Sequence, residues 1–129
     1  MLSHVVRILL VEDEPLIASF VSRGLRAEGY VTAVAASGDE AVAELHEREW
    51  DLVVLDLKLP GRDGFSVLRE LRADPKAGRT PVIVHTAEGF DEQERAWLEE
   101  HADVILDKQS GRAEELVAAV SRAAAEARG

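Results

Sequence analysis

The sequence contains no cysteine. Disulfide frameworks, thiolate zinc sites and cysteine nucleophiles are therefore excluded, and a reducing compartment is permitted. The chain also has no apolar run near the roughly 20 residues that span a bilayer. Its first residues, 1–7, lack the long apolar core of a signal peptide. We therefore expect a cytoplasmic protein.

Basic residues are outnumbered: 15 Lys and Arg stand against 25 Asp and Glu, for a formal charge of −10. A surface this acidic repels nucleic-acid phosphates and anionic lipids. We therefore expect no direct contact with nucleic acid and no association with membranes. The length of 129 residues fits one domain spanning 1–129 and leaves little room for a second.

Short apolar runs recur along the chain. They are rich in Val, Ile and Leu, and most are continuous rather than alternating with polar residues, which is typical of strands buried on both faces of a parallel sheet. The five runs span 8–11, 31–35, 52–55, 82–84 and 104–106.

Amphipathic helical patterns separate these runs. Helices are predicted from 15 to 28, from 38, from 64 to 72, from about 91 and from 112 to 127. Capping boxes mark two of the starts, at Ser37 with Glu40 and at Asp91 with Glu94. The apolar stripe of the first helix consists of Leu16, Ile17, Phe20, Val21 and Leu25.

Strands and helices thus alternate five times. Because crossovers between parallel strands are right-handed, the helices must cover both faces of the sheet. The sequence predicts an α/β fold with a five-stranded, doubly wound parallel sheet.

Polar side chains follow four of the five predicted strands. Glu12 and Asp13 follow the first, Asp56 the third, Thr86 ends the fourth, and Lys108 follows the fifth. The carboxyl ends of parallel strands share one edge, where ligands bind in such sheets. We therefore expect these side chains to converge.

Three carboxylates at one point repel one another unless a cation intervenes. Mg²⁺ suits a site with so few protein ligands. With a hydroxyl and an ammonium opposite, the pocket would fit a tetrahedral oxyanion, and next to Asp56 that anion would be a phosphoryl group. Taken singly, the acidic residues could only cap the next helix, and Lys108 could be solvated.

The motifs resemble the receiver domain of two-component response regulators over nearly the whole chain. The sequence reads ILLVEDEP at 8–15, DLKLPGRDG at 56–64 and PVIVHTA at 81–87, followed by Lys108. Asp13 precedes Asp56 by 43 residues, Asp56 precedes Thr86 by 30, and Thr86 precedes Lys108 by 22. The resemblance implies the flavodoxin-like strand order 2-1-3-4-5. A receiver domain would occupy 1–129, so we expect no output domain in this chain.

The resemblance also implies residue roles. Asp56 is expected to accept a phosphoryl group from a phosphohistidine. Glu12, Asp13 and Asp56, with the backbone carbonyl of Lys58, are expected to hold Mg²⁺. Thr86 and Lys108 are expected to bind the phosphoryl oxygens, and Thr86 to move inward on activation.

The implied partners are a sensor histidine kinase or a histidine phosphotransfer protein, and a downstream protein target. The domain would be a signalling switch that catalyses only its own phosphorylation and dephosphorylation. Its output would run through the face of the fourth helix, fifth strand and fifth helix, and a homodimer that forms on phosphorylation is one form of that output. The alternative is a receiver-like interaction module that works without phosphorylation.

The sequence departs from the family pattern near Lys108. Ile105 replaces the aromatic switch residue that the family usually has three positions before the lysine, so output could instead run through Phe90 and Trp97. Gln109 replaces a proline that usually follows a cis peptide bond. A cis bond before a non-proline residue costs about 2.5–4 kcal/mol, so we predict a trans bond between Lys108 and Gln109.

Three further residues lie near the expected pocket. Lys58 and Glu88 occupy positions that in the family tune the lifetime of the phosphorylated state. They could pair across the pocket mouth and slow hydrolysis, or both could simply be solvated. His85 is expected to be a core histidine rather than a phosphoacceptor.

Overall fold

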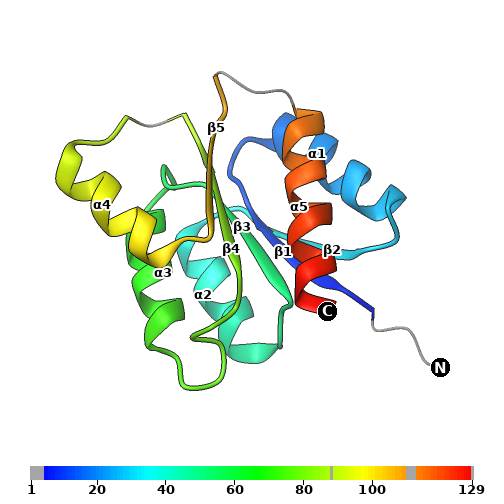
Figure 1. The fold of residues 1–129 in the computed structure, drawn as a ribbon, viewed down its shortest axis with the longest axis horizontal. Helices are drawn as coiled ribbons and strands as arrows, with labels where there is room; N and C mark the ends of the chain where they lie inside the picture. The colour runs from blue at the N-terminus through cyan, green and yellow to red at the C-terminus, as the bar shows by residue number, and fades with distance from the viewer. Residues whose placement is uncertain (1–4, 88, 110–112, 129) are drawn as a thin grey trace.

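The computed structural model describes residues 5–87, 89–109 and 113–128. Five strands and five helices alternate along this part of the chain (Figure 1). The strands are β1 (Arg7–Val11), β2 (Val31–Ala35), β3 (Leu52–Leu55), β4 (Val82–Thr86) and β5 (Val104–Asp107). The helices are α1 (Pro15–Ala27), α2 (Gly38–Glu47), α3 (Gly64–Ala73), α4 (Glu92–His101) and α5 (Ala113–Arg128).

The strands form one parallel sheet in the order β2-β1-β3-β4-β5, which confirms the predicted fold class and strand order. Since β1 lies between β2 and β3, the chain winds one way from β1 to β2 and then reverses, crossing from β2 over β1 to β3. This reversal places the ligand-binding crevice of an open sheet at the carboxyl ends of β1 and β3.

Helices cover both faces of the sheet. One face packs against α2, α3 and α4, through side chains such as Leu45, Leu68 and Leu98 (Figure 1). The other face packs against α1 and α5, through side chains such as Leu25 and Leu116. Burial on both faces explains why the strand sequences read as continuous apolar runs.

The predicted capping residues start their helices. The Ser37 hydroxyl accepts a hydrogen bond of 3.1 Å from the Glu40 N–H. Asp91 and Glu94 form a reciprocal capping box, in which each side chain accepts a bond from the other residue's N–H. These bonds satisfy backbone donors that the first helical turn leaves free.

The apolar stripe predicted for α1 is only partly buried. Val21 and Leu25 are buried, but Leu16 is 86% exposed and Phe20 is 50% exposed. A groove of about 260 Å³ separates this part of α1 from Ala113 at the start of α5. Helical periodicity gives the direction of these side chains, but the separation of the two helices decides whether they are covered.

None of the described helices has the length and apolar content needed to cross a lipid bilayer.

The first turn of α3 packs directly on the backbone that carries Asp56. A Cβ atom added to Gly64 would lie 2.4 Å from the Asp56 carbonyl oxygen and 2.6 Å from the Leu57 Cα. The Gly64 N–H also donates a 2.9 Å hydrogen bond to the Leu57 carbonyl. Only glycine permits this approach.

Replacing Gly64 with alanine should therefore lower the free energy of unfolding by about 1–3 kcal/mol, as overpacking does. Urea denaturation measures the change. Gly89→Ala is the matched control, because a Cβ there would meet no atom within 4 Å. Equal stabilities of the two variants would contradict the close packing.

Candidate functional site

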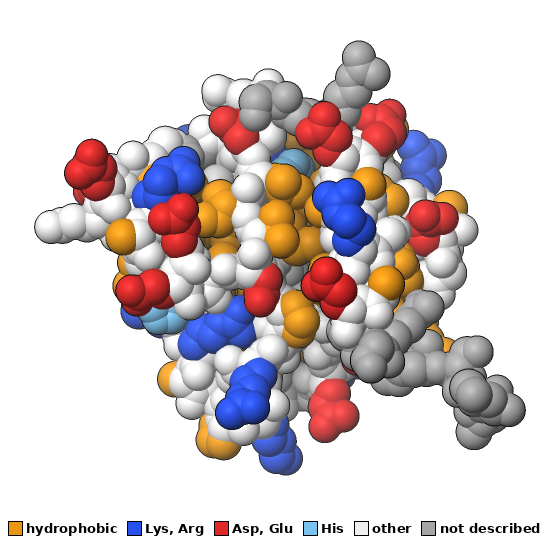
Figure 2. All heavy atoms as spheres, in the orientation of Figure 1, with side chains coloured by type: hydrophobic (Ala, Val, Ile, Leu, Met, Phe, Trp, Pro, Cys, Tyr) orange, Lys and Arg blue, Asp and Glu red, His pale blue; other side chains and the backbone are white. Residues whose placement is uncertain are grey.

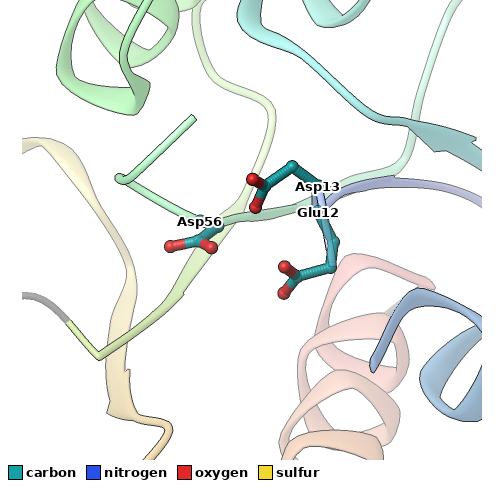
Figure 3. A group of neighbouring side chains, drawn as sticks. All are labelled: Glu12, Asp13 and Asp56. Atoms are coloured by element: carbon teal, nitrogen blue, oxygen red, sulfur yellow. The ribbon is translucent and has the colours of Figure 1, made fainter. Parts of the chain in front are cut away.

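Three carboxylates meet at the carboxyl edge of the sheet. Glu12 and Asp13 lie in the loop after β1, and Asp56 follows β3 (Figure 3). One oxygen from each lies within 4.8 Å of the others. Glu12 and Asp56 are buried, whereas Asp13 is exposed. The convergence predicted from the strand ends is confirmed for these residues.

Strand register explains this convergence. Val11 pairs with Leu55, so the residues that follow them, Glu12 and Asp56, leave neighbouring strands side by side. The Asp56 N–H donates to the Val11 carbonyl at 3.0 Å, and the Glu12 N–H donates to the Ala35 carbonyl at 3.0 Å. The backbone beneath both carboxylates is therefore fixed by the sheet.

Lys108 reaches into the same cluster from the end of β5. Its Nζ lies 2.8 Å from Asp56 Oδ2, 2.7 Å from Glu12 Oε1 and 3.2 Å from Glu14 Oε2. The peptide bond between Lys108 and Gln109 is trans, as predicted. The loss of the usual proline has therefore not displaced the ammonium from Asp56.

The electrostatics of the site follow from burial and these contacts. Burial raises the pKa of the Glu12 carboxyl above its ordinary value, although the hydrogen bond from Lys108 opposes this. Burial also disfavours the Lys108 ammonium, but its hydrogen bonds with Asp56 and Glu12 outweigh that effect and raise the pKa of Lys108. The ammonium therefore stays charged at physiological pH.

Thr86 completes the set around Asp56. Its hydroxyl donates a 2.9 Å hydrogen bond to Asp56 Oδ1, and the side chain is buried. One oxygen of Asp56 thus contacts a hydroxyl and the other an ammonium. The structure brings together all five residues that the strand ends predicted.

A cleft of about 530 Å³ opens beside Asp56. Its lining consists of Asp13, Glu14, Asp56, Lys58, Ala87, Lys108 and Gln109. The Lys58 side chain is exposed at the rim, and its N–H donates a 3.2 Å hydrogen bond to Asp56 Oδ1. Glu88 lies outside the described residues, so its pairing with Lys58 stays a prediction.

Glu14 is the site residue that sequence reasoning missed. Glu14 occupies the N-cap position of α1, but its side chain makes no capping hydrogen bond. Its carboxylate instead reaches Lys108. Its place beside two metal-ligand candidates was the available signal, but no sequence pattern shows which way an exposed side chain turns.

Comparison with known proteins identifies this arrangement. The family model for the response regulator receiver domain matches residues 8–121. The chain belongs to this family.

Curated relatives support the assignment. The chain is 43% identical over 103 residues to "Transcriptional regulatory protein TcrA" from Mycobacterium tuberculosis, a match covering 80% of this chain and 40% of that protein. It is 40% identical over 105 residues to "DNA-binding response regulator MtrA" from Mycolicibacterium smegmatis, covering 81% of this chain and 40% of that protein. The chain therefore matches well under half the length of these relatives.

Solved receiver structures share the fold and hold Mg²⁺. The response regulator TrrA from Thermotoga maritima, solved in complex with Mg²⁺ and BeF, has 33% identity and a TM-score of 0.77, covering 92% of this chain and 99% of its own. The receiver domain of the sensor histidine kinase PA1611 from Pseudomonas aeruginosa has 30% identity and a TM-score of 0.81, covering 95% and 99%. A magnesium ion is coordinated in its active-site cleft. The acidic triad of the present receiver domain resembles such a site.

The residue at the usual aromatic switch position is Ile105 in this receiver domain. Ile105 is partly buried in β5 and lines a cavity of about 360 Å³ together with Thr86, Phe90 and Gln109. Next to this cavity, the Phe65 ring lies 6.4 Å from that of Phe90.

Trp97 of α4 belongs to the same aromatic cluster. Its ring lies 6.0 Å from that of Phe65 and 4.1 Å from that of His101. The cluster joins the loop after β4 to α4 and α3. The rings therefore link Phe90 to α3 and α4, while Thr86 lines the same cavity as Phe90. The use of this region as a switch stays a prediction.

His85 is buried in β4 and faces the groove between α1 and α5. Burial lowers the pKa of its imidazole below the ordinary value of 6.5, and the charge of Lys108 lowers it further. Its place in the sheet core agrees with the expected core role.

The stability of the receiver domain should consequently fall as the pH decreases below about 6.5, because the unfolded chain then binds a proton at His85 that the folded chain does not. The slope from one such group is at most about 1.4 kcal/mol per pH unit. His85→Leu should make the free energy of unfolding decline less steeply from about pH 6.5 to about pH 5. This range lies above the pKa values of most carboxylates.

Urea denaturation at a series of pH values measures this slope. His46→Gln is the control, because the His46 side chain is 55% exposed. A His85→Leu variant that retained the wild-type slope would refute the contribution of His85.

Proposed function

We propose that this receiver domain is a phosphorylation-operated switch in which Asp56 accepts a phosphoryl group from a phosphohistidine of a sensor histidine kinase or a histidine phosphotransfer protein. The observation that carries the proposal is the contact of Asp56 with both Thr86 and Lys108, beside Glu12 and Asp13. A hydroxyl and an ammonium aimed at a carboxylate are the donors that a phosphoryl group on that carboxylate requires.

The residues of the cluster fit Mg²⁺. Carboxylates and a carbonyl are the hard oxygen ligands that this ion prefers, and it keeps several waters. Glu12, Asp13 and Asp56 would hold it, with the backbone carbonyl of Lys58. When bound, the ion would neutralise negative charge on the transferring group.

The transfer itself needs positioning more than covalent help from the protein. An Asp56 oxygen forms a bond to phosphorus while the bond from phosphorus to the donor imidazole nitrogen breaks, and the bonding electron pair leaves with that nitrogen. Lys108 then pairs with a phosphoryl oxygen, and the Thr86 hydroxyl donates to another. The phosphoryl group carries almost two negative charges where the carboxylate carried one, and its contacts with Lys108 and Thr86 would shift a pre-existing equilibrium.

The rim beside the site supports docking of a protein donor. Leu16 and Phe20 are exposed on α1 and line the groove that also reaches His85 and Lys108. A carrier whose phosphohistidine reaches Asp56 would rest on the surface around the cleft, and this rim is part of that surface. Exposed apolar side chains next to the phosphoacceptor would give that carrier an anchoring surface.

The proposed output surface is the face formed by α4, β5 and α5. Figure 2 shows apolar side chains at the centre of this face, over β5 and between the two helices, with charged side chains around them. Val104, Ile105 and Leu106 of β5 are all partly exposed. A downstream protein or a second phosphorylated copy would bind here, with Phe90 and Trp97 linking the surface to Thr86.

Acetyl phosphate with Mg²⁺ should label the wild-type domain, and Asp56→Ala or chelation of Mg²⁺ should abolish the label. Phosphate-affinity gel shift measures the labelled fraction. Glu28→Ala, which removes an exposed acid at the far end of α1, should label normally. Undiminished labelling of a folded Asp56→Ala variant would refute the proposal, and an unlabelled wild type would favour an interaction module that works without phosphorylation.

Truncating both Leu16 and Phe20 to alanine should lower kcat/KM for transfer from a phosphorylated histidine phosphotransfer protein by about tenfold or more, because loss of an interface anchor typically costs above 1 kcal/mol. Labelling by acetyl phosphate should be unchanged, since a small donor needs no docking surface.

Val31→Ala is the control. Val31 is an apolar residue that is 45% exposed, but it lies at the amino end of β2, away from the carboxyl ends of the strands where Asp56 lies. Equal losses with both donors would show damage to the site rather than to docking.

A further inference from the structure

We propose that Glu14 is a positioning residue that holds Lys108 on the α1 side of the cleft and thereby slows phosphorylation of Asp56 by small anionic donors. This inference rests on the proposed function and extends it to a residue outside the acceptor, its two donors and the acidic triad. It begins from the contact between Glu14 Oε2 and Lys108 Nζ at 3.2 Å.

The local structure commits the Glu14 side chain to this contact. Glu14 is the N-cap residue of α1, a position whose side chain usually accepts a bond from the first helical turn. Here the side chain makes no such bond, and the Glu14 N–H donates to Glu12 Oε2 at 3.1 Å. The backbone of Glu14 is thus held by one carboxylate of the site while its own carboxylate extends to Lys108.

Lys108 has no donor to spare in this arrangement. An ammonium carries three N–H donors, and its Nζ faces three carboxylates, those of Glu12, Glu14 and Asp56. A phosphoryl oxygen can pair with Lys108 only if one of these contacts is released or weakened. Capture of the phosphoryl group is therefore in competition with the carboxylates.

Burial decides which carboxylate is released at least cost. The Glu12 side chain is 2% exposed, so water cannot readily replace the ammonium there. The Glu14 side chain is 58% exposed, so its carboxylate is readily hydrated when the contact with Lys108 breaks. Glu14 is accordingly the partner that Lys108 gives up.

The position of Glu14 also affects approach to the site. Glu14 lines the cleft of about 530 Å³ together with Asp13 and Asp56, against the positive charges of Lys58 and Lys108. A carboxylate at the cleft wall repels a small anionic donor and attracts a divalent cation. Removing the charge of Glu14 should strengthen binding of the anionic donor and slightly weaken binding of the divalent cation.

The test compares Glu14→Gln with the wild type. The variant should be labelled by acetyl phosphate about two- to fivefold faster and bind beryllofluoride about two- to fivefold more tightly, the range expected for one partly exposed ion pair. Labelling rates come from phosphate-affinity gels at saturating Mg²⁺, and beryllofluoride binding from calorimetry. Raising the salt concentration should shrink both differences.

Two further variants separate the effect of the contact between Glu14 and Lys108 from the effect of net charge. Glu28→Gln makes the same change in net charge at the far end of α1 and should match the wild type. Glu14→Asp keeps the charge but shortens the side chain by one methylene, so it should lose the contact and bind beryllofluoride more tightly than the wild type.

The inference is overturned if Glu14→Gln matches the wild type, if Glu28→Gln reproduces its effect, or if Glu14→Asp behaves like the wild type. A wild type that acetyl phosphate does not label at Asp56 would instead overturn the proposed function and this inference together. Circular dichroism and urea denaturation check that each variant is folded.

Discussion

Lys108 holds together carboxylates that would otherwise repel one another. Glu12 and Asp56 are both buried, and the ammonium lies within 2.8 Å of each. These ion pairs offset the cost of burying both carboxylates, and the arrangement at the sheet edge depends on them.

The same group has two tasks, and they compete. Lys108 neutralises the resting cluster, and under the proposed function it also pairs with the phosphoryl group. A fixed positive charge can do both only if one resting partner is easily released. The unequal burial of Glu12 and Glu14 provides for this, because hydration compensates the exposed carboxylate but not the buried one.

The scaffold leaves the acceptor little freedom. Hydrogen bonds of the sheet fix the backbone at Glu12 and Asp56, and α3 packs against the carbonyl of Asp56 at Gly64. Motion is more readily accommodated towards Ile105, where a cavity separates Thr86 from Phe90. Under the proposed function, this contrast between a fixed Asp56 and a cavity beside Thr86 would let the chemistry stay in place while a surface changes.

Much of the fold and site could be predicted from the sequence. The continuous apolar runs fixed the strands, and Ser37 and Asp91 marked helix starts, because burial and capping depend on residues close in the chain. Residues at the strand ends predicted the site, since parallel strands must end at one edge. The exposure of Leu16 and Phe20 could not be predicted, because periodicity gives the side of a helix on which a residue lies but not what packs against it.

The sequence by itself determined the parallel α/β architecture and the set of Glu12, Asp13, Asp56, Thr86 and Lys108. Only the tertiary structure decided that Glu14 turns to Lys108 rather than capping α1, and that Ile105 borders a cavity. Local patterns constrain the backbone and the side of an element on which a residue lies. The partner of a long side chain depends on which charges the folded chain brings within a few ångström, and that distance has no counterpart in sequence spacing.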